Sequence, residues 1–134
     1  MPRHFTPEEA TALLQEIRPL VEELVEHRRS QRGAEAERRE LATRIAGNGG
    51  AIDSQQLAAL AALLEQTRIG IARCVNRIHG VGAIVKDVDT GLVDFPALWG
   101  GEEVLLCWRL GEPEVAHWHG LEEGFAGRKA LPFE

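Results

Sequence analysis

The sequence contains little cysteine and no long apolar run. Only Cys74 and Cys107 occur among its 134 residues, too few for a disulfide scaffold. No apolar run approaches the roughly 18 residues that span a bilayer, and the start of the chain has no apolar signal-peptide stretch. We therefore expect a cytoplasmic protein with reduced thiols and no membrane partner.

The short motifs of common enzymes are also missing. The sequence has no phosphate-binding loop, no dinucleotide fingerprint and no nucleophile elbow, and it has neither Cys-x-x-Cys nor His-Glu-x-x-His. Its composition is that of an ordinary globular protein, with 44% hydrophobic and 27% charged residues. Residues 1–134 are therefore predicted to form a single domain.

The net charge of −6 comes from the C-terminal third of the chain. Residues 83–134 contain four Lys or Arg and ten Asp or Glu. A nucleic-acid-binding protein needs a basic face to neutralise phosphates. The arginines between residues 28 and 39 alternate with glutamates, as is typical of a solvated helix face. We therefore expect no nucleic-acid partner.

Residues 6–80 are predicted to form a helical hairpin. The segment Thr6-Pro7-Glu8-Glu9 is typical of a capped helix start, and apolar residues then recur at three-four spacing as far as Val25. Glycines at 47–50 predict the end of this helix, and Asp53 begins a second helix that ends near Gly80. Because the predicted loop is short, the two helices must run antiparallel with coiled-coil character.

The second helix carries an apolar stripe opposite the polar middle of the first. Such a stripe should not remain exposed to water. We therefore predict a homodimer through the helical region, with a complex with another protein as the alternative. The stripe consists of Leu57, Leu60, Leu63, Leu64 and Ile71.

Residues 83–119 change to the period of β-strands and predict two β-hairpins. The first turns at Asp89-Thr90-Gly91, and a bulge at Gly91 would place Lys86 opposite Asp94. The second turns between Leu110 and Glu114. Residues 120–134 are predicted to be an irregular tail. The expected fold class is α+β, a long antiparallel helical hairpin followed by a small antiparallel sheet of two β-hairpins.

The C-terminal half contains a specific set of motifs: Val85-Lys86-Asp87, Asp89-x-Gly91-Leu92-Val93-Asp94-Phe95-Pro96, Glu103-Val104-x-Leu106 through Glu114, Trp118-His119 and Glu123 through Arg128. Together with the Phe5-Thr6 start and the long charged helical hairpin, these motifs resemble a bacterial family catalogued as a domain of unknown function, DUF2203. The resemblance implies a prokaryotic protein, but it implies no activity, substrate or cofactor.

One set of residues has the chemistry of metal ligands: Cys107, His117 and His119. Alternate residues of a strand share a face, so the two histidines point the same way. If the second hairpin pairs Arg109 with Val115, Cys107 lies opposite His117, and zinc or iron accepts a thiolate with two imidazoles. If the register shifts by one residue, Cys107 faces the other side of the sheet and the site is lost.

The acidic third also predicts a binding surface, because Trp and Arg dominate binding hot spots. Its candidate residues are Asp87, Asp94, Arg109, Glu112, Glu114, Trp118 and Arg128. The alternative is that the arginines only neutralise neighbouring carboxylates and that the carboxylates form turns.

The sequence thus favours a bacterial binding or adaptor module that holds a partner protein or small ligand and needs no cofactor. The alternative is a metal-dependent enzyme or metal-binding protein that holds zinc or iron at Cys107, His117 and His119.

Overall fold

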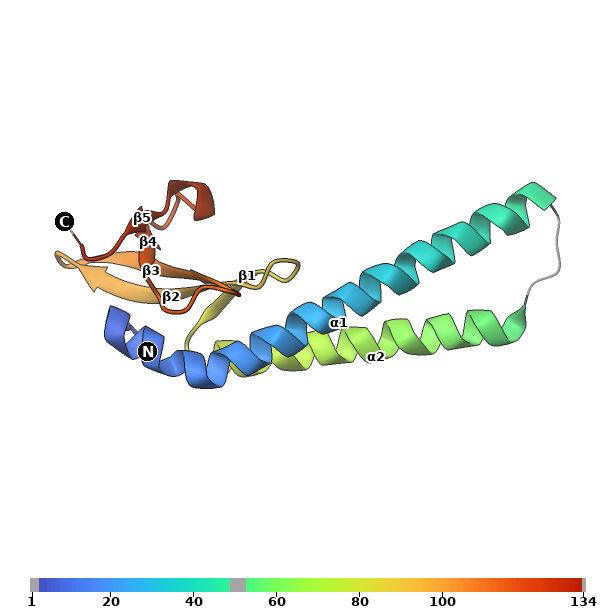
Figure 1. Cartoon of the computed structure of the whole chain (residues 1–134), viewed down its shortest axis with the longest axis horizontal. Coiled ribbons are helices and arrows are strands. Elements are labelled where there is room, and N and C mark those ends of the chain that lie inside the picture. Colours follow the sequence, from blue (N-terminus) through green and yellow to red (C-terminus); the bar gives the residue numbers. More distant parts are fainter. Residues whose placement is uncertain (1–2, 49–52, 134) are drawn as a thin grey trace.

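The computed structural model describes residues 3–48 and 53–133. Two long packed helices are followed by a five-stranded antiparallel sheet, which confirms the α+β prediction (Figure 1). The helices are α1 (Pro7–Asn48) and α2 (Ser54–Gly80). The strands are β1 (Ile84–Asp87), β2 (Leu92–Trp99), β3 (Glu102–Arg109), β4 (His117–His119) and β5 (Lys129–Ala130), with a 3-10 turn η1 (Phe125–Gly127) before β5.

Both helix starts are capped as predicted. The Thr6 hydroxyl accepts a hydrogen bond from the Glu9 amide, and the Glu9 carboxylate accepts one from the Thr6 amide. The Asp53 carboxylate accepts hydrogen bonds from the first amides of α2. Helix α1 continues without interruption to Asn48, beyond the predicted end at Gly47. The rest of the predicted glycine loop, residues 49 and 50, lies outside the described residues.

The N-terminal part of α1 reaches beyond α2 and packs against the sheet (Figure 1). Pro19 lies inside this helix, and α1 changes direction in its first half (Figure 1), as expected where proline removes a backbone hydrogen bond. The main core joins the two layers, and its fully buried large side chains include Ile17, Val21, Leu24, Ile78, Val93, Phe95, Leu106 and Trp108.

A smaller core holds the far end of the hairpin together. Leu60 of α2 is buried with Ala34 and Leu41 of α1, and Leu57 and Leu64 pack against them. Much of the apolar stripe on α2 therefore faces α1, whereas Leu63 remains exposed. The homodimer stays a prediction. It now rests only on the apolar side chains of α2 that remain exposed, such as Leu63.

The strands follow one another in chain order, β1-β2-β3-β4-β5. Gly100 and Gly101 both have positive φ and form the turn between β2 and β3. The conditional pairing of Lys86 with Asp94 was wrong, because an irregularity between Val85 and Asp87 places Ile84 opposite Asp94. The tail is also more regular than predicted, since β5 pairs with β4.

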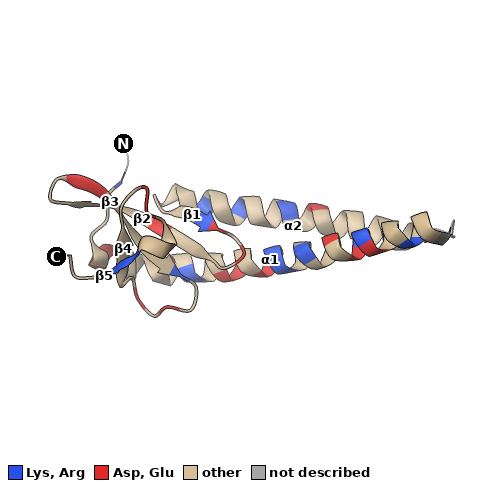
Figure 2. Cartoon of the chain, turned by 90° about the horizontal axis from the view of Figure 1, so that it is seen from above, with Lys and Arg blue, Asp and Glu red and all other residues tan. Residues whose placement is uncertain are grey.

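The charges are distributed along the molecule. Figure 2 shows acidic residues on the strands and turns of the sheet, acidic and basic residues interspersed along α1, and mainly basic charges on α2. In the described part of the chain, neither helix combines the length and the apolar character needed to cross a membrane.

Candidate functional site

Three side chains with metal-ligand chemistry meet on the face of the sheet opposite α1. Val93, Leu106 and their alternating neighbours point into the main core, so Asp94 and Cys107 point to the other face. The register pairs Asp94 with Cys107 and Cys107 with His117. His119 lies two residues beyond His117 on the same face of β4. We call Asp94, Cys107 and His119 the sheet cluster.

The sheet cluster is almost completely buried. The exposed fractions are 1% for Asp94, 0% for Cys107 and 2% for His119. One ligand atom from each residue lies within 4.8 Å of the others. The tail with η1 and β5 runs over this side of the sheet, whereas α1 lies on the other (Figure 1).

The two ring nitrogens of His119 both face oxygen atoms. Nδ1 lies 2.8 Å from the carbonyl oxygen of Gly120, so Nδ1 must carry a proton and donate it. Nε2 lies 3.1 Å from Oδ2 of Asp94. A neutral imidazole with its proton on Nδ1 presents a lone pair at Nε2, and so does an ionised carboxylate. A positive species between them, either a proton or a metal ion, is needed to make this contact favourable.

The carboxyl group of Asp94 is incompletely satisfied. Its Oδ1 atom is buried and has no hydrogen-bond partner among the described residues. Burial raises the pKa of Asp94 above its usual range, while the neighbouring His119 and Lys86 act in the opposite direction. Lys86 is half exposed, with Nζ 4.0 Å from Oδ2 of Asp94. Oδ1 of Asp94 therefore lacks a hydrogen bond of ordinary geometry, and the thiol of Cys107 is close enough to the carboxylate to affect its pKa.

Burial also determines the state of Cys107. Removal from water, and next the charge of Asp94, raise the pKa of the Cys107 thiol to about 12. The thiol is therefore neutral at physiological pH and is a poor nucleophile. A metal ion would replace its proton, because only the thiolate is a strong ligand.

His117 belongs to a neighbouring network and not to the sheet cluster. Its Nδ1 contacts the guanidinium group of Arg128 and lies 3.7 Å from Oε2 of Glu112. Arg128 in turn donates a 2.7 Å hydrogen bond to Glu112. The predicted pairing of Cys107 with His117 is present. The imidazole of His117, however, contacts Arg128 and does not join the sheet cluster. Asp94 provides the third candidate ligand that was predicted to be His117.

The residues of the predicted binding surface do not form one exposed patch. Asp94 and Trp118 are buried, and Glu112 and Arg128 bind one another. Asp87 holds its turn through the Asp89 amide and the Thr90 hydroxyl. Arg109, stacked near Phe125, and Glu114 are exposed.

Sequence reasoning named Asp94 among the carboxylates of the binding surface and did not place it beside Cys107. A signal for it was present, because the two-residue turn Gly100-Gly101 fixes the register of β2 on β3. Counting back from Trp99 opposite Glu102 places Asp94 opposite Cys107. The sequence analysis considered the registers within the two predicted hairpins but not the register of β2 on β3.

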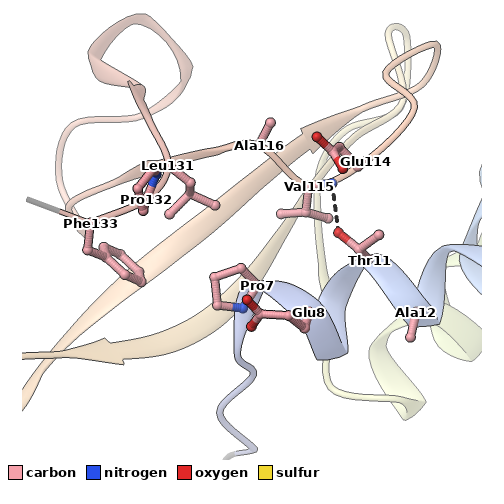
Figure 3. A pocket seen from close by; sticks show the side chains of 10 residues that line it. All are labelled: Pro7, Glu8, Thr11, Ala12, Glu114, Val115, Ala116, Leu131, Pro132 and Phe133. Carbon is pink, nitrogen blue, oxygen red and sulfur yellow. Dashed lines mark hydrogen bonds between the residues drawn. The ribbon is translucent and has the colours of Figure 1, made fainter.

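A hollow at the N-terminal end of α1 offers few reactive side chains. It has a volume of about 680 Å³ and lies between the start of α1 and the C-terminal segment (Figure 3). Its walls are mostly apolar, and the Thr11 hydroxyl accepts a hydrogen bond from the Val115 amide. Its titratable side chains are Glu8 and Glu114, which do not face a nucleophile or a metal-ligating group there.

A family model described as "Uncharacterized conserved protein (DUF2203)" matches residues 3–131. The chain belongs to this family. The match confirms the resemblance inferred from the C-terminal motifs and from the Phe5-Thr6 start with its helical hairpin. Neither the curated proteins nor the solved structures that were compared gave a match. Membership of DUF2203 adds no activity, so the chemistry of the sheet cluster has to support the functional proposal.

Proposed function

We propose that this protein binds a divalent transition metal, of which zinc is the best fit, through Asp94, Cys107 and His119. Carboxylate, thiolate and imidazole are ligands that zinc accepts together. The observation that carries the proposal is the contact of His119 Nε2 with Asp94, beside the unpartnered Oδ1 of Asp94. A cation bound there would interact favourably with both Nε2 of His119 and the carboxylate of Asp94.

The hydrogen bond from His119 to Gly120 supports a metal ligand. Metal-binding histidines usually donate their second ring N–H to a carbonyl or carboxylate, which fixes the tautomer and orients the other nitrogen toward the metal. Nδ1 of His119 makes such a bond with the Gly120 carbonyl, which leaves Nε2 available.

The competing occupant is a proton. A protonated His119 would form a buried ion pair with Asp94, and Cys107 would remain a thiol. That arrangement would explain the 3.1 Å contact but would leave Oδ1 of Asp94 without a hydrogen bond of ordinary geometry, at a cost of up to roughly 1–3 kcal/mol. The neighbouring thiol of Cys107 offsets part of this cost by donating to the carboxylate. A metal ion with a dianionic ligand set engages all three side chains, so we favour the metal.

The burial of the cluster favours a structural or storage role for the metal over turnover of a substrate. Catalytic zinc sites have three protein ligands and keep a fourth position open to solvent or substrate, whereas structural sites have four protein ligands. The sheet cluster offers three ligands, all at least 98% buried, so its burial and not its ligand count supports a structural role. A metal would connect β2, β3 and β4 and would stabilise the sheet through its binding free energy.

Titration with Co²⁺ tests this function, because a cobalt–thiolate bond gives a charge-transfer absorption band. The Cys74→Ala variant is used, so that Cys107 is the one thiol present. We expect the band with one equivalent of Co²⁺ and its loss on the additional change Asp94→Asn or His119→Gln. His117→Gln is the matched control and should retain the band. A folded Cys74→Ala protein without the band would overturn the proposal.

A second candidate function, the predicted adaptor module, is supported by exposed apolar side chains with acidic neighbours near the turn between β2 and β3. Leu98 and Trp99 at the end of β2 are exposed, on opposite faces of the strand, and Glu102 and Glu103 begin β3 after the Gly100-Gly101 turn. Leu121 lies beside Trp99 and these glutamates in the lining of the same shallow hollow. Such a surface suits a basic, apolar segment of a partner protein. The double variant Leu98→Glu, Trp99→Glu should abolish binding of that partner, while Ala59→Glu on α2 should not.

A further inference from the structure

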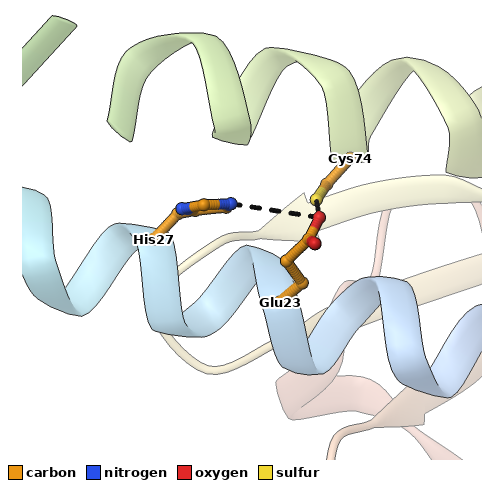
Figure 4. Close-up of side chains that lie close together, drawn as sticks. All are labelled: Glu23, His27 and Cys74. Atoms are coloured by element: carbon orange, nitrogen blue, oxygen red, sulfur yellow. Dashed lines mark hydrogen bonds and ion pairs between the residues drawn. The ribbon is translucent and has the colours of Figure 1, made fainter. Parts of the chain in front are cut away.

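A second group of metal-ligand side chains lies on the helical hairpin, away from the sheet cluster. Glu23 and His27 are one turn apart on α1, and Cys74 of α2 faces them across the helix interface (Figure 4). We call these three residues the hairpin cluster. Cys74 is 1% exposed, whereas the side chains of His27 and Glu23 are 34% and 57% exposed. The cluster is therefore closed on the α2 side and open to water on the α1 side.

The three side chains converge on one carboxylate oxygen. The thiol of Cys74 donates a hydrogen bond of 2.7 Å to Oε2 of Glu23. Nε2 of His27 lies 3.9 Å from the same oxygen, and Figure 4 shows the imidazole directed toward it. The three candidate ligand atoms lie within 4.8 Å of one another.

Gly70 makes the space that His27 occupies. A Cβ atom at this position would lie 2.5 Å from Nε2 of His27, closer than two such atoms approach. Gly70 is buried in the interior of α2, where glycine costs about 1 kcal/mol relative to alanine. The missing side chain lets the imidazole lie between the helices, one turn of α2 from Cys74.

We propose that the hairpin cluster is a second site for a divalent metal ion of the zinc and cobalt type. Glu23 would supply a carboxylate oxygen, His27 its Nε2 and Cys74 a thiolate sulfur, so that the ion joins α1 to α2. The remaining coordination position opens to solvent beside Glu23 and His27 and takes a water molecule. This proposal uses none of the residues of the sheet cluster.

Binding at this site exchanges one proton for the metal. The thiol of Cys74 loses its proton to solvent, a metal–sulfur bond forms, and the hydrogen bond to Glu23 is replaced by a metal–oxygen bond. Because a tetrahedral ion with bonds of about 2.0–2.3 Å needs ligand atoms further apart than the present thiol–carboxylate contact, that contact opens slightly. Glu23, as the most exposed of the three, has the freedom to move.

The experiment uses the full chain with Cys107→Ala, which removes the thiol of the sheet cluster. We expect this variant to bind one equivalent of Co²⁺ with a cobalt–thiolate band. The additional change Cys74→Ala should remove the band, and His27→Gln should weaken cobalt affinity by at least about tenfold. Glu26→Gln, an exposed carboxylate change on the same helix, is the matched control and should leave the titration unchanged.

Gly70→Ala provides a test that leaves all three ligands in place. It should displace His27 and weaken cobalt binding in the Cys107→Ala protein, whereas Gly33→Ala in the same helical hairpin should not. A folded Cys107→Ala protein without the band overturns the hairpin site, and so does a cobalt affinity that neither His27→Gln nor Gly70→Ala changes. Failure of the sheet site is seen separately, as loss of the band in the Cys74→Ala protein that retains Cys107.

Discussion

Gly70 and Gly33 both lie inside long helices, yet their surroundings differ. A Cβ at Gly70 would meet the ring of His27 at 2.5 Å, whereas a Cβ at Gly33 would meet nothing within 4 Å. Replacement of a helical glycine by alanine is otherwise favourable by about 0.5–1 kcal/mol. The space around each glycine therefore decides whether its replacement by alanine stabilises or destabilises the protein.

Gly70→Ala is expected to lower the free energy of unfolding by about 1–2 kcal/mol, because overpacking costs about 1–3 kcal/mol and exceeds the gain in helix propensity. Gly33→Ala is expected to raise it by about 0.5–1 kcal/mol. Urea unfolding followed by circular dichroism measures both. Stabilisation by Gly70→Ala would show that His27 moves away at little cost.

Asp89 connects the turn between β1 and β2 to α1 through an ion pair. Its carboxylate accepts a 2.8 Å hydrogen bond from Arg28 and a 3.3 Å bond from Arg32. The hydrogen bond from Arg28 is the main cause that lowers the pKa of Asp89 below its usual range. Because the folded pKa is depressed, this pair stabilises the fold above the unfolded pKa of about 3.9 and loses its effect as the pH falls through the folded value.

Asp89→Asn should therefore reduce stability at pH 7 and have a smaller effect at pH values below the folded pKa of Asp89. The effect should be modest, because the pair is solvent-exposed and screened by salt. Denaturant unfolding at a series of pH values tests this, with Glu26→Gln as the control for a surface pair within one helix. A difference from wild type that stays constant down to the lowest pH would contradict it.

Residue identities in the sheet site were only partly predictable. Cys107 and His119 were recognised from chemistry and strand period, and the conditional pairing of Cys107 with His117 occurs in the sheet. The direction in which His117 turns depends on Arg128, which arrives from the tail. The contact between Arg128 and His117 is long-range, and no local sequence pattern encodes it. The sequence of β4 alone therefore could not show that Asp94, and not His117, lies beside Cys107 and His119.

The two ends of the helical hairpin differ in packing. Seventeen buried residues form the main core around the sheet and the adjoining helix segments, but only three form the core at the far end in the described part of the hairpin. Few buried apolar contacts mean that a segment opens at low free energy. The hairpin should therefore open first at its far end.

Amide hydrogen exchange should be faster for residues 34–47 and 54–64 than for residues 13–24 and 74–78. Leu60→Ala should enlarge this difference and cost about 2 kcal/mol, near the lower end for a buried leucine because the cluster is small. Exchange measured by mass spectrometry on peptides from each segment gives the comparison. Uniform protection along both helices would contradict the expected order.

The two helices could be predicted from the sequence, whereas the last strand could not. The caps and the three-four spacing predicted both helices, because these signals are local. The strand β5 has two residues, Lys129–Ala130, which is too short for a period to be read. It is held by pairing with β4, a long-range contact that a local pattern does not encode.

At the scale of the whole molecule, the homodimer remains our proposal for assembly. Leu63 and Ile69 are 38% and 43% exposed on α2 and are its candidate contacts. Light scattering should then give twice the chain mass of 14.8 kDa, and Leu63→Glu with Ile69→Glu should return the mass to that of one chain. A wild-type mass of 14.8 kDa at micromolar concentration would rule out the dimer.

The central claim is that the sheet cluster holds a metal ion, and the metal content of the whole folded chain tests it most directly. The Cys74→Ala protein, purified without an affinity tag, is incubated with zinc, separated from free metal and analysed for zinc per chain. The account predicts one zinc ion per chain, and its loss on the additional change Asp94→Asn. A chain that circular dichroism shows to be folded and that retains no zinc would contradict the account.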